Sequence, residues 1–193
     1  MVAIPKEPLK MTIEEYLEWE PQQDIRYEYV NGEVFAMTGG TIPHNDIALN
    51  FYTALRPHLS TKGCKANVSD VKVQVTPQSP YYYPDVIVSC DPEDLKARKF
   101  YKNPKLIAEV LSPGTSSKDR GEKFTYYISM PSLQEYILID SERISVERYC
   151  RGEGRMWLYY PYIAGDIVTF SSIGFECPIE LLYEGIEFES INN

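Results

Sequence analysis

Hydrophobic and polar positions follow helical spacing in some parts of this chain and strand spacing in others. Residues 12–15, with the sequence TIEE, have the form of a capping box, which predicts a short helix that ends near Trp19. Residues 26–30 and 33–37 are apolar-rich runs on either side of Asn31-Gly32, the dipeptide typical of a two-residue β-hairpin. The N-terminal part therefore predicts a helix followed by a hairpin.

A longer helix is predicted after the hairpin, from about residue 43 to residue 59. Its apolar face would be formed by Ile47, Leu49, Phe51, Leu55 and Leu59. Residues 66–76 then alternate between apolar and polar side chains, as one strand or as two strands separated by a bulge near Asp70.

Two runs in the middle of the chain, residues 84–89 and 105–111, are apolar on both faces, as expected of central strands. A polar connector, residues 91–103, joins them. A helix is predicted over residues 116–126, followed by a strand over residues 134–140 and further strands in an antiparallel meander to Phe170. These elements predict an α/β domain, a mixed central sheet flanked by helices. We expect a single domain over residues 1–193, with a core of about residues 10–185.

Composition limits the function classes. The chain has 193 residues, a net charge of −9 and a pI of about 4.8. This acidity, with no apparent basic stripe, argues against tight non-specific binding to nucleic acid, although a bound metal would invert the local charge. The four cysteines are scattered, which predicts reduced thiols. We also expect a cytoplasmic protein without a membrane span, because no signal peptide or long apolar run is apparent.

The candidate chemistry lies in the two central runs. Asp85 stands at the entry of the first run and Glu109 within the second. If the two strands are neighbours, both carboxylates would bind one divalent metal, which polarises a phosphate and activates water. Lys123 lies 14 positions after Glu109, where its ammonium would orient that water or stabilise charge on the phosphate. Two such acids and a lysine are the minimum set for a metal-dependent phosphodiesterase.

Each of these residues also has an ordinary structural explanation. Asp85 would simply meet solvent or cap a turn at a strand entry. Glu109 would form a structural salt bridge, because a buried unpaired carboxylate is costly. Lys123 would be a solvated helix residue. His44, near the start of the predicted long helix, would contact phosphate, transfer protons, or have a merely polar role.

Several short motifs occur together in a specific order, and with them the chain resembles the Uma-type family of predicted bacterial restriction endonucleases, part of the PD-(D/E)XK nuclease superfamily. The resemblance covers roughly residues 10–185. The motifs are YEYVNGE at 27–33, PDV at 84–86, EVLSP at 109–113, Asp119 with Lys123, and PSLQEY at 131–136 with Asp140.

The resemblance implies a restriction-endonuclease-like fold and a Mg²⁺-dependent phosphodiesterase site. Asp85 corresponds to the motif aspartate and Glu109 to the motif acid. Leu111 stands where the superfamily lysine is expected, and Lys123 occupies the place on the following helix where the similar family has its lysine. An additional acid is expected from the hairpin: we favour Glu33, with Glu28 as the alternative and a solvent-facing charge as the structural explanation of either.

The sequence thus predicts a metal-dependent endonuclease that hydrolyses DNA with Mg²⁺ or Mn²⁺, bound to Asp85 and Glu109. DNA would bind weakly without the metal. A homodimer is expected, because cutting two strands needs two sites. The alternatives are a catalytically silent binding or assembly module with the same fold, and a phosphodiesterase for small or single-stranded nucleotides.

Overall fold

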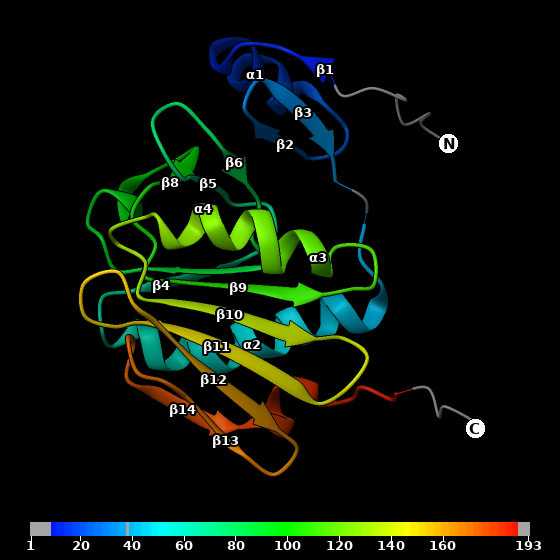
Figure 1. Ribbon diagram of the computed structural model, residues 1–193, viewed down its shortest axis with the longest axis vertical. Helices are drawn as coiled ribbons and strands as arrows, with labels where there is room; N and C mark the ends of the chain where they lie inside the picture. Colours follow the sequence, from blue (N-terminus) through cyan, green and yellow to red (C-terminus); the bar gives the residue numbers. More distant parts are fainter. Residues whose placement is uncertain (1–8, 38, 189–193) are drawn as a thin grey trace.

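A six-stranded mixed sheet forms the centre of the molecule in the computed structural model, which describes residues 9–37 and 39–188 (Figure 1). Strands β9 and β10 run parallel, and every other neighbouring pair in this sheet is antiparallel. The mixed central sheet is therefore confirmed. In spatial order the strands are β12 (Trp157–Ile163), β11 (Ser145–Arg151), β10 (Glu135–Asp140), β9 (Leu106–Leu111), β7 (Val86–Ser89) and β4 (Lys65–Val68).

A second sheet of six short strands lies beside the first and contains the predicted hairpin, at the top of Figure 1. The hairpin turn is confirmed, since Asn31 and Gly32 have φ of 50° and 91° and Val30 pairs with Glu33. The order is β1 (Leu9–Lys10), β3 (Glu33–Ala36), β2 (Tyr27–Val30), β6 (Tyr81–Tyr82), β5 (Lys72–Gln74) and β8 (Phe100–Tyr101).

Residues 66–76 form two strands that belong to different sheets. β4 joins the central sheet and β5 joins the second sheet. Between them Ser69 and Asp70 have positive φ values of 51° and 20°, so the chain changes direction there. The break near Asp70 is one of the two predicted alternatives.

Helices cover both faces of the central sheet (Figure 1). The helix α2 (Ile42–Ser60) packs on one face, and its N-cap Thr41 accepts a hydrogen bond from the His44 amide. On the other face α3 (Ser116–Lys118), a π-helical turn η3 (Asp119–Lys123) and α4 (Phe124–Ile128) form one continuous segment. The predicted capping box starts α1 (Ile13–Trp19). Within the described residues, three 3₁₀ segments complete the helical structure: η1 (Glu20–Gln22), η2 (Asp94–Lys96) and η4 (Ile179–Tyr183).

The alternation of β9 decides where its acid points. Ala108 and Val110 pack on the α2 side, whereas Ile107 and Leu111 pack with Tyr127 on the α4 side. Glu109 has the same parity as Ile107 and Leu111, so it faces α4. Leu49, predicted for the apolar face of α2, is instead 40% exposed.

The predicted meander ends one strand earlier than expected. β13 (Ile167–Phe170) pairs with β14 (Phe175–Pro178) in a separate two-stranded sheet, and β12 is left at the edge of the central sheet. Within the described residues, no helix is both long and apolar enough to cross a lipid bilayer.

The expectation of reduced thiols is wrong for Cys64 and Cys90, which form a disulfide. Lys65 pairs with Ser89 where β4 meets β7, so the residues just outside this pair lie opposite each other. The pairing of β4 with β7 brings the two cysteines together, and their separation in the sequence does not indicate this contact. Cys150 and Cys177 are free and buried.

Candidate functional site

Asp85 and Glu109 are brought together by neighbouring strands. Asp85 lies just before β7, which pairs with β9 through Val86 and Ala108. The Asp85 carboxylate accepts a hydrogen bond from the Val110 amide (2.7 Å), and its other oxygen lies 3.0 Å from His44 Nε2. Asp85 is therefore held by β9 on one side and by the first turn of α2 on the other.

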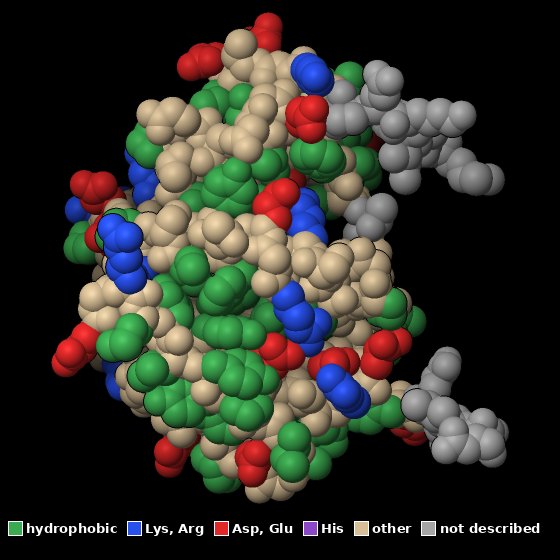
Figure 2. Space-filling model, in the orientation of Figure 1, with side chains coloured by type: hydrophobic (Ala, Val, Ile, Leu, Met, Phe, Trp, Pro, Cys, Tyr) green, Lys and Arg blue, Asp and Glu red, His purple; other side chains and the backbone are tan. Residues whose placement is uncertain are grey.

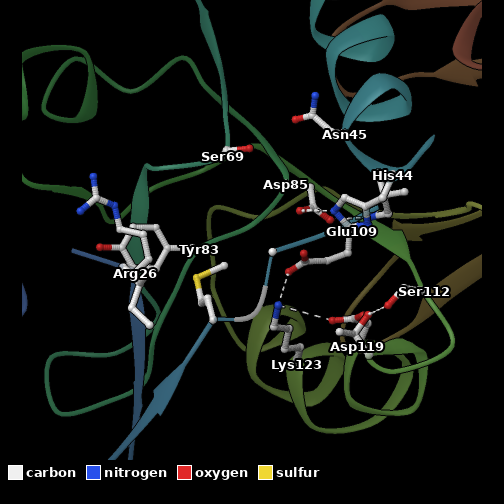
Figure 3. Close-up of a pocket in the computed structure, with 16 residues that line it drawn as sticks. Arg26, His44, Asn45, Ser69, Tyr83, Asp85, Glu109, Ser112, Asp119 and Lys123 are labelled. Carbon is white, nitrogen blue, oxygen red and sulfur yellow. Dashed lines mark hydrogen bonds and ion pairs between the residues drawn. The ribbon is translucent and has the colours of Figure 1, made fainter. Parts of the chain in front are cut away.

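The Glu109 side chain is buried, with 2% of the residue exposed. Its Oε1 accepts hydrogen bonds from the Lys123 ammonium and from the Tyr127 hydroxyl, both at 3.0 Å. Glu109 thus forms a salt bridge with Lys123 and also lines a cavity, as Figure 3 shows.

Lys123 reaches the site from η3 and is surrounded by acids. Its Nζ lies 3.0 Å from Glu109 Oε1, 3.3 Å from Glu28 Oε1 and 3.4 Å from Asp119 Oδ1. Leu111, in the position of the superfamily lysine, is buried in the apolar core. The ammonium of Lys123 therefore reaches the carboxylate of Glu109 from the helix and not from the strand.

The hairpin acid in this cluster is Glu28, not the favoured Glu33. Glu28 is 5% exposed and contacts both Lys123 and Lys118, the latter at 2.7 Å. The side chain of Glu33 is 39% exposed and pairs with Lys10 at 3.7 Å. The prediction for Glu33 is therefore wrong in its geometry: β3 places it by the solvent-exposed β1, whereas β2 places Glu28 under the lysines.

Asp85, Glu109 and Lys123 line a cavity of about 520 Å³ (Figure 3). The acidic end is formed by Asp85 before β7, Glu109 on β9 and Asp119 on η3, with His44 of α2 beside Asp85. Arg26, Ser69 and Tyr83 lie on the other side of the cavity in Figure 3. Asp119 is not among the predicted site residues, although its spacing of four from Lys123 places both on one helical face. The polar lining residues are Arg26, His44, Asn45, Ser69, Tyr83, Asp85, Glu109, Ser112, Thr115, Asp119 and Lys123.

Burial and neighbouring charges shift the pKa values of the ionisable groups in the site. Burial raises the pKa of Glu109, and the charges of Asp119, Asp85 and Glu28 raise it further, against the opposing effect of Lys123. Burial alone would lower the pKa of Lys123, but Glu109, Glu28 and Asp119 together raise it well above its ordinary value. Lys123 is therefore a protonated ammonium at neutral pH.

Burial and charge also shift the pKa values of the neighbouring Glu28, His44 and Asp119. Burial favours a neutral Glu28, but Lys123 and Lys118 outweigh it and lower the pKa of this carboxyl. Burial would lower the pKa of His44, whereas its hydrogen bond and charge interaction with Asp85 raise it. Burial raises the pKa of Asp119 despite the nearby Lys123. The excess of carboxylates over ammonium groups favours a cation at this end of the cavity.

The residues that would hold a metal are the pair Asp85 and Glu109. Across residues 9–37 and 39–188, no three His, Cys, Asp or Glu side chains form a ready-made metal-binding group. Mg²⁺, however, commonly binds through one or two carboxylates and completes its shell with water and substrate phosphate. Both carboxylates line the cavity, and their hard oxygen donors fit Mg²⁺ or Mn²⁺. The metal remains a prediction.

Comparisons with known proteins agree with this architecture. A crystal structure described as "a putative nuclease belonging to DUF820", from Anabaena variabilis ATCC 29413, superimposes with a TM-score of 0.74 at 17% identity. The match covers 90% of this chain and 98% of that one, which confirms the nuclease-like α/β fold.

Two relatives come from Synechocystis sp. (strain ATCC 27184 / PCC 6803 / Kazusa). Uncharacterized protein slr1290 is 38% identical over 179 residues, 93% of this chain and 94% of the relative. Uncharacterized protein sll1609 is 33% identical over 150 residues, 77% and 85% of the two chains. The family model described as "Uma2: Putative restriction endonuclease" matches residues 13–180. The chain therefore belongs to the Uma2 family.

Proposed function

We propose that this protein is an endonuclease that hydrolyses DNA phosphodiester bonds with the help of Mg²⁺ or Mn²⁺. The observation that carries this proposal is the meeting of Asp85, Glu109 and Lys123 in one cavity, although they come from the entry of β7, from β9 and from the helical turn η3. The description of the family and that of the Anabaena structure support a nuclease.

Asp85 and Glu109 would hold the metal in this proposal. When bound, the ion would polarise the scissile phosphate and lower the pKa of an attacking water. Asp85 is oriented for this task by the Val110 amide and His44. Glu109 is oriented by Tyr127 and Lys123.

Lys123 would stabilise the negative charge that grows on the phosphate oxygens, or orient the water. Its ammonium stays protonated because three carboxylates surround it. A fixed positive charge in a buried, preorganised site needs little rearrangement during the reaction, which is the main source of electrostatic catalysis. Glu28 and Asp119 would help to position Lys123, because both contact its ammonium.

Plasmid nicking tests the proposal. Supercoiled DNA is incubated with the wild type in Mg²⁺ or Mn²⁺, and in EDTA. We expect metal-dependent nicking that Asp85→Asn and Lys123→Met each reduce by at least about 100-fold, a typical effect of removing one charge-stabilising group. Glu33→Gln is the matched control, since this acid lies outside the cavity lining. Nicking that persists in EDTA, or in both site variants, would refute the proposal.

The acidity of the chain favours a second candidate, a phosphodiesterase for small or single-stranded nucleotides. With 28 Asp and Glu against 19 Lys and Arg, the protein as a whole repels a long duplex. Cleavage of a short single strand or dinucleotide faster than of plasmid, with the same sensitivity to Asp85→Asn, would identify this activity. Purified wild type that cleaves none of these substrates would instead identify a non-catalytic module.

We further propose that duplex cleavage requires a homodimer, because each chain contributes one Asp85–Glu109 pair and two strands need two cuts. Analytical ultracentrifugation tests this directly. A chain that sediments only as a monomer, with or without DNA, yet linearises plasmid in one step would refute the dimer.

A further inference from the structure

Positive charge is concentrated in one short segment of this acidic chain. Residues 96–105, with the sequence KARKFYKNPK, contain five of the 19 Lys and Arg and none of the 28 Asp and Glu. Most of this segment belongs to the predicted polar connector. The structure shows what the connector presents: four exposed cations, here called the basic platform, namely Lys96, Arg98, Lys99 and Lys102.

No carboxylate among the described residues forms an ion pair with a side chain of the basic platform. None of the ion pairs found within 9–37 and 39–188 involves any of its four side chains. The cations next to the site's carboxylates behave differently, since Lys118 and Lys123 are both paired. Exposed and unpaired cations are available for an external anion without first breaking an internal contact.

The segment is held in a defined shape. The buried Asp94 carboxylate accepts hydrogen bonds from the Ser89 hydroxyl (2.8 Å), the Lys102 amide (2.8 Å) and the Asn103 amide (2.9 Å), which closes the loop at its base. β8 within the loop pairs in parallel with β5 through Phe100 and Tyr101. The platform is therefore preorganised, which lowers the entropic cost of binding.

Three of the four platform cations surround a shallow hollow in the surface. Arg98, Lys99 and Lys102 line a shallow hollow of about 310 Å³ together with Glu93 and Asp94, and the Asp94 carboxylate is already engaged by hydrogen bonds within the loop. Lys102 Nζ lies 5.7 Å from the centre of the Phe100 ring, which keeps its ammonium at the hollow. Figure 2 shows several Lys and Arg side chains, with Asp and Glu side chains among them, along the left edge of the molecule, near where Figure 1 places β8.

The platform lies at the other end of β7 from the catalytic cavity. Asp85 precedes the strand, and Ser89 at its end contacts Asp94. At a rise of about 3.3 Å per residue, four residues separate the two ends by roughly 13 Å. That is about four base-pair steps of DNA, whose phosphates follow each strand at about 3.4 Å along the helix axis.

We propose that the basic platform binds the phosphate backbone of duplex DNA, independently of sequence and outside the catalytic cavity. The choice of DNA over another polyanion rests on the proposed nuclease function. The platform is a locally positive surface on a chain whose net charge is −9. It anchors long DNA in the absence of metal, while the cavity carries out the cleavage.

Metal-free binding tests this proposal separately from catalysis. Fluorescence anisotropy with a labelled 30-base-pair duplex in EDTA is measured over a range of salt concentrations. The test variant is Lys96→Gln/Arg98→Gln/Lys99→Gln. The control variant, Lys10→Gln/Arg143→Gln/Arg155→Gln, removes the same charge from exposed cations elsewhere. Circular dichroism and the melting temperature establish that both are folded.

We expect the platform variant to bind duplex at least about tenfold more weakly, and the slope of log K against log salt to become shallower by about 0.9 for each phosphate that is no longer neutralised. The control should bind within about twofold of wild type, because the cations that it removes lie outside the basic platform. Equal weakening in platform and control variants would overturn the proposal, as would a wild type that binds anionic phospholipid vesicles but no duplex. Platform-dependent binding by a protein that never cleaves DNA would keep the platform and refute only the nuclease.

Discussion

The Lys123 ammonium lies 3.0 Å from Glu109 Oε1, across 14 residues of sequence that include the turn from β9 into the helix. The π-helical turn η3 begins at Asp119 and ends at Lys123, so the ammonium and one of its carboxylate partners come from a single local distortion of the helix. π-Helical turns occur frequently at functional sites. The contact joins the strand and the helix that together form the acidic end of the cavity.

Breaking this pair should destabilise the fold as well as the site. Lys123→Met leaves Glu109 buried without its counter-charge, which typically costs about 3 kcal/mol when one partner of a buried pair is removed. Combining it with Glu109→Gln should recover part of that loss, because the unpaired charge is gone. Urea denaturation of the wild type, both single variants and the double variant measures the coupling. Strictly additive losses would contradict a direct interaction.

Glu28 should be sensitive to substitution, and Glu33 should not. Glu28 contacts two ammonium groups from a buried position, so we expect Glu28→Gln to lower the free energy of unfolding by about 2 kcal/mol. Glu33 has one longer, partly exposed contact, and Glu33→Gln should cost less than about 0.5 kcal/mol. If denaturation midpoints shifted equally for the two variants, the assignment of the hairpin acid would be wrong.

The contribution of Glu28 should depend on pH. Although burial opposes it, Lys123 and Lys118 lower the folded-state pKa of this carboxyl below its ordinary value of 4.5. A group with a depressed folded pKa stabilises the fold fully above its unfolded pKa, and that stabilisation is lost as pH falls through the folded pKa. The advantage of the wild type over Glu28→Gln should therefore be constant from pH 7 to about pH 5 and shrink below that. Urea denaturation at several pH values checks the sign: an advantage that grows on acidification would contradict it.

The cysteines should divide into two classes. Cys64 and Cys90 are joined, whereas burial raises the pKa of the Cys177 and Cys150 thiols to about 11. Protein purified without reductant should therefore show no rapid alkylation at pH 8. It should show two reactive thiols after unfolding, and four after unfolding with reductant. Mass spectrometry of alkylated peptides measures each site, and four modified cysteines without reductant would exclude the disulfide.

Local signals predicted the elements that carry the site. The capping box at Thr12 and the turn at Asn31-Gly32 act through hydrogen bonds and backbone angles within a few residues, so their sequence patterns are sufficient. The uninterrupted apolar runs around Asp85 and Glu109 predicted central strands, because only a strand covered on both faces tolerates such a run. Neighbouring central strands then brought the two acids together.

The hairpin acid and the cysteine pair depended on longer-range packing. Glu28 and Glu33 have nearly equivalent positions around one turn, and which of them lies under Lys118 and Lys123 is decided by how the second sheet docks on the helical segment. The bond between Cys64 and Cys90 depends on the pairing of β4 with β7. Neither the position of Glu28 nor the disulfide produces a periodic pattern in the sequence.

The sequence by itself determined the types of element, the central position of two acid-bearing strands and the family resemblance, because these depend on local backbone preferences, apolar periodicity and motif order. Only the tertiary structure decided that Lys123 reaches Glu109, that Glu28 joins it, and that four cations of residues 96–105 stand exposed and outside the ion pairs of the described residues. The physical reason is the same in each case: charge interactions act through space, and only packing determines which charged groups become neighbours.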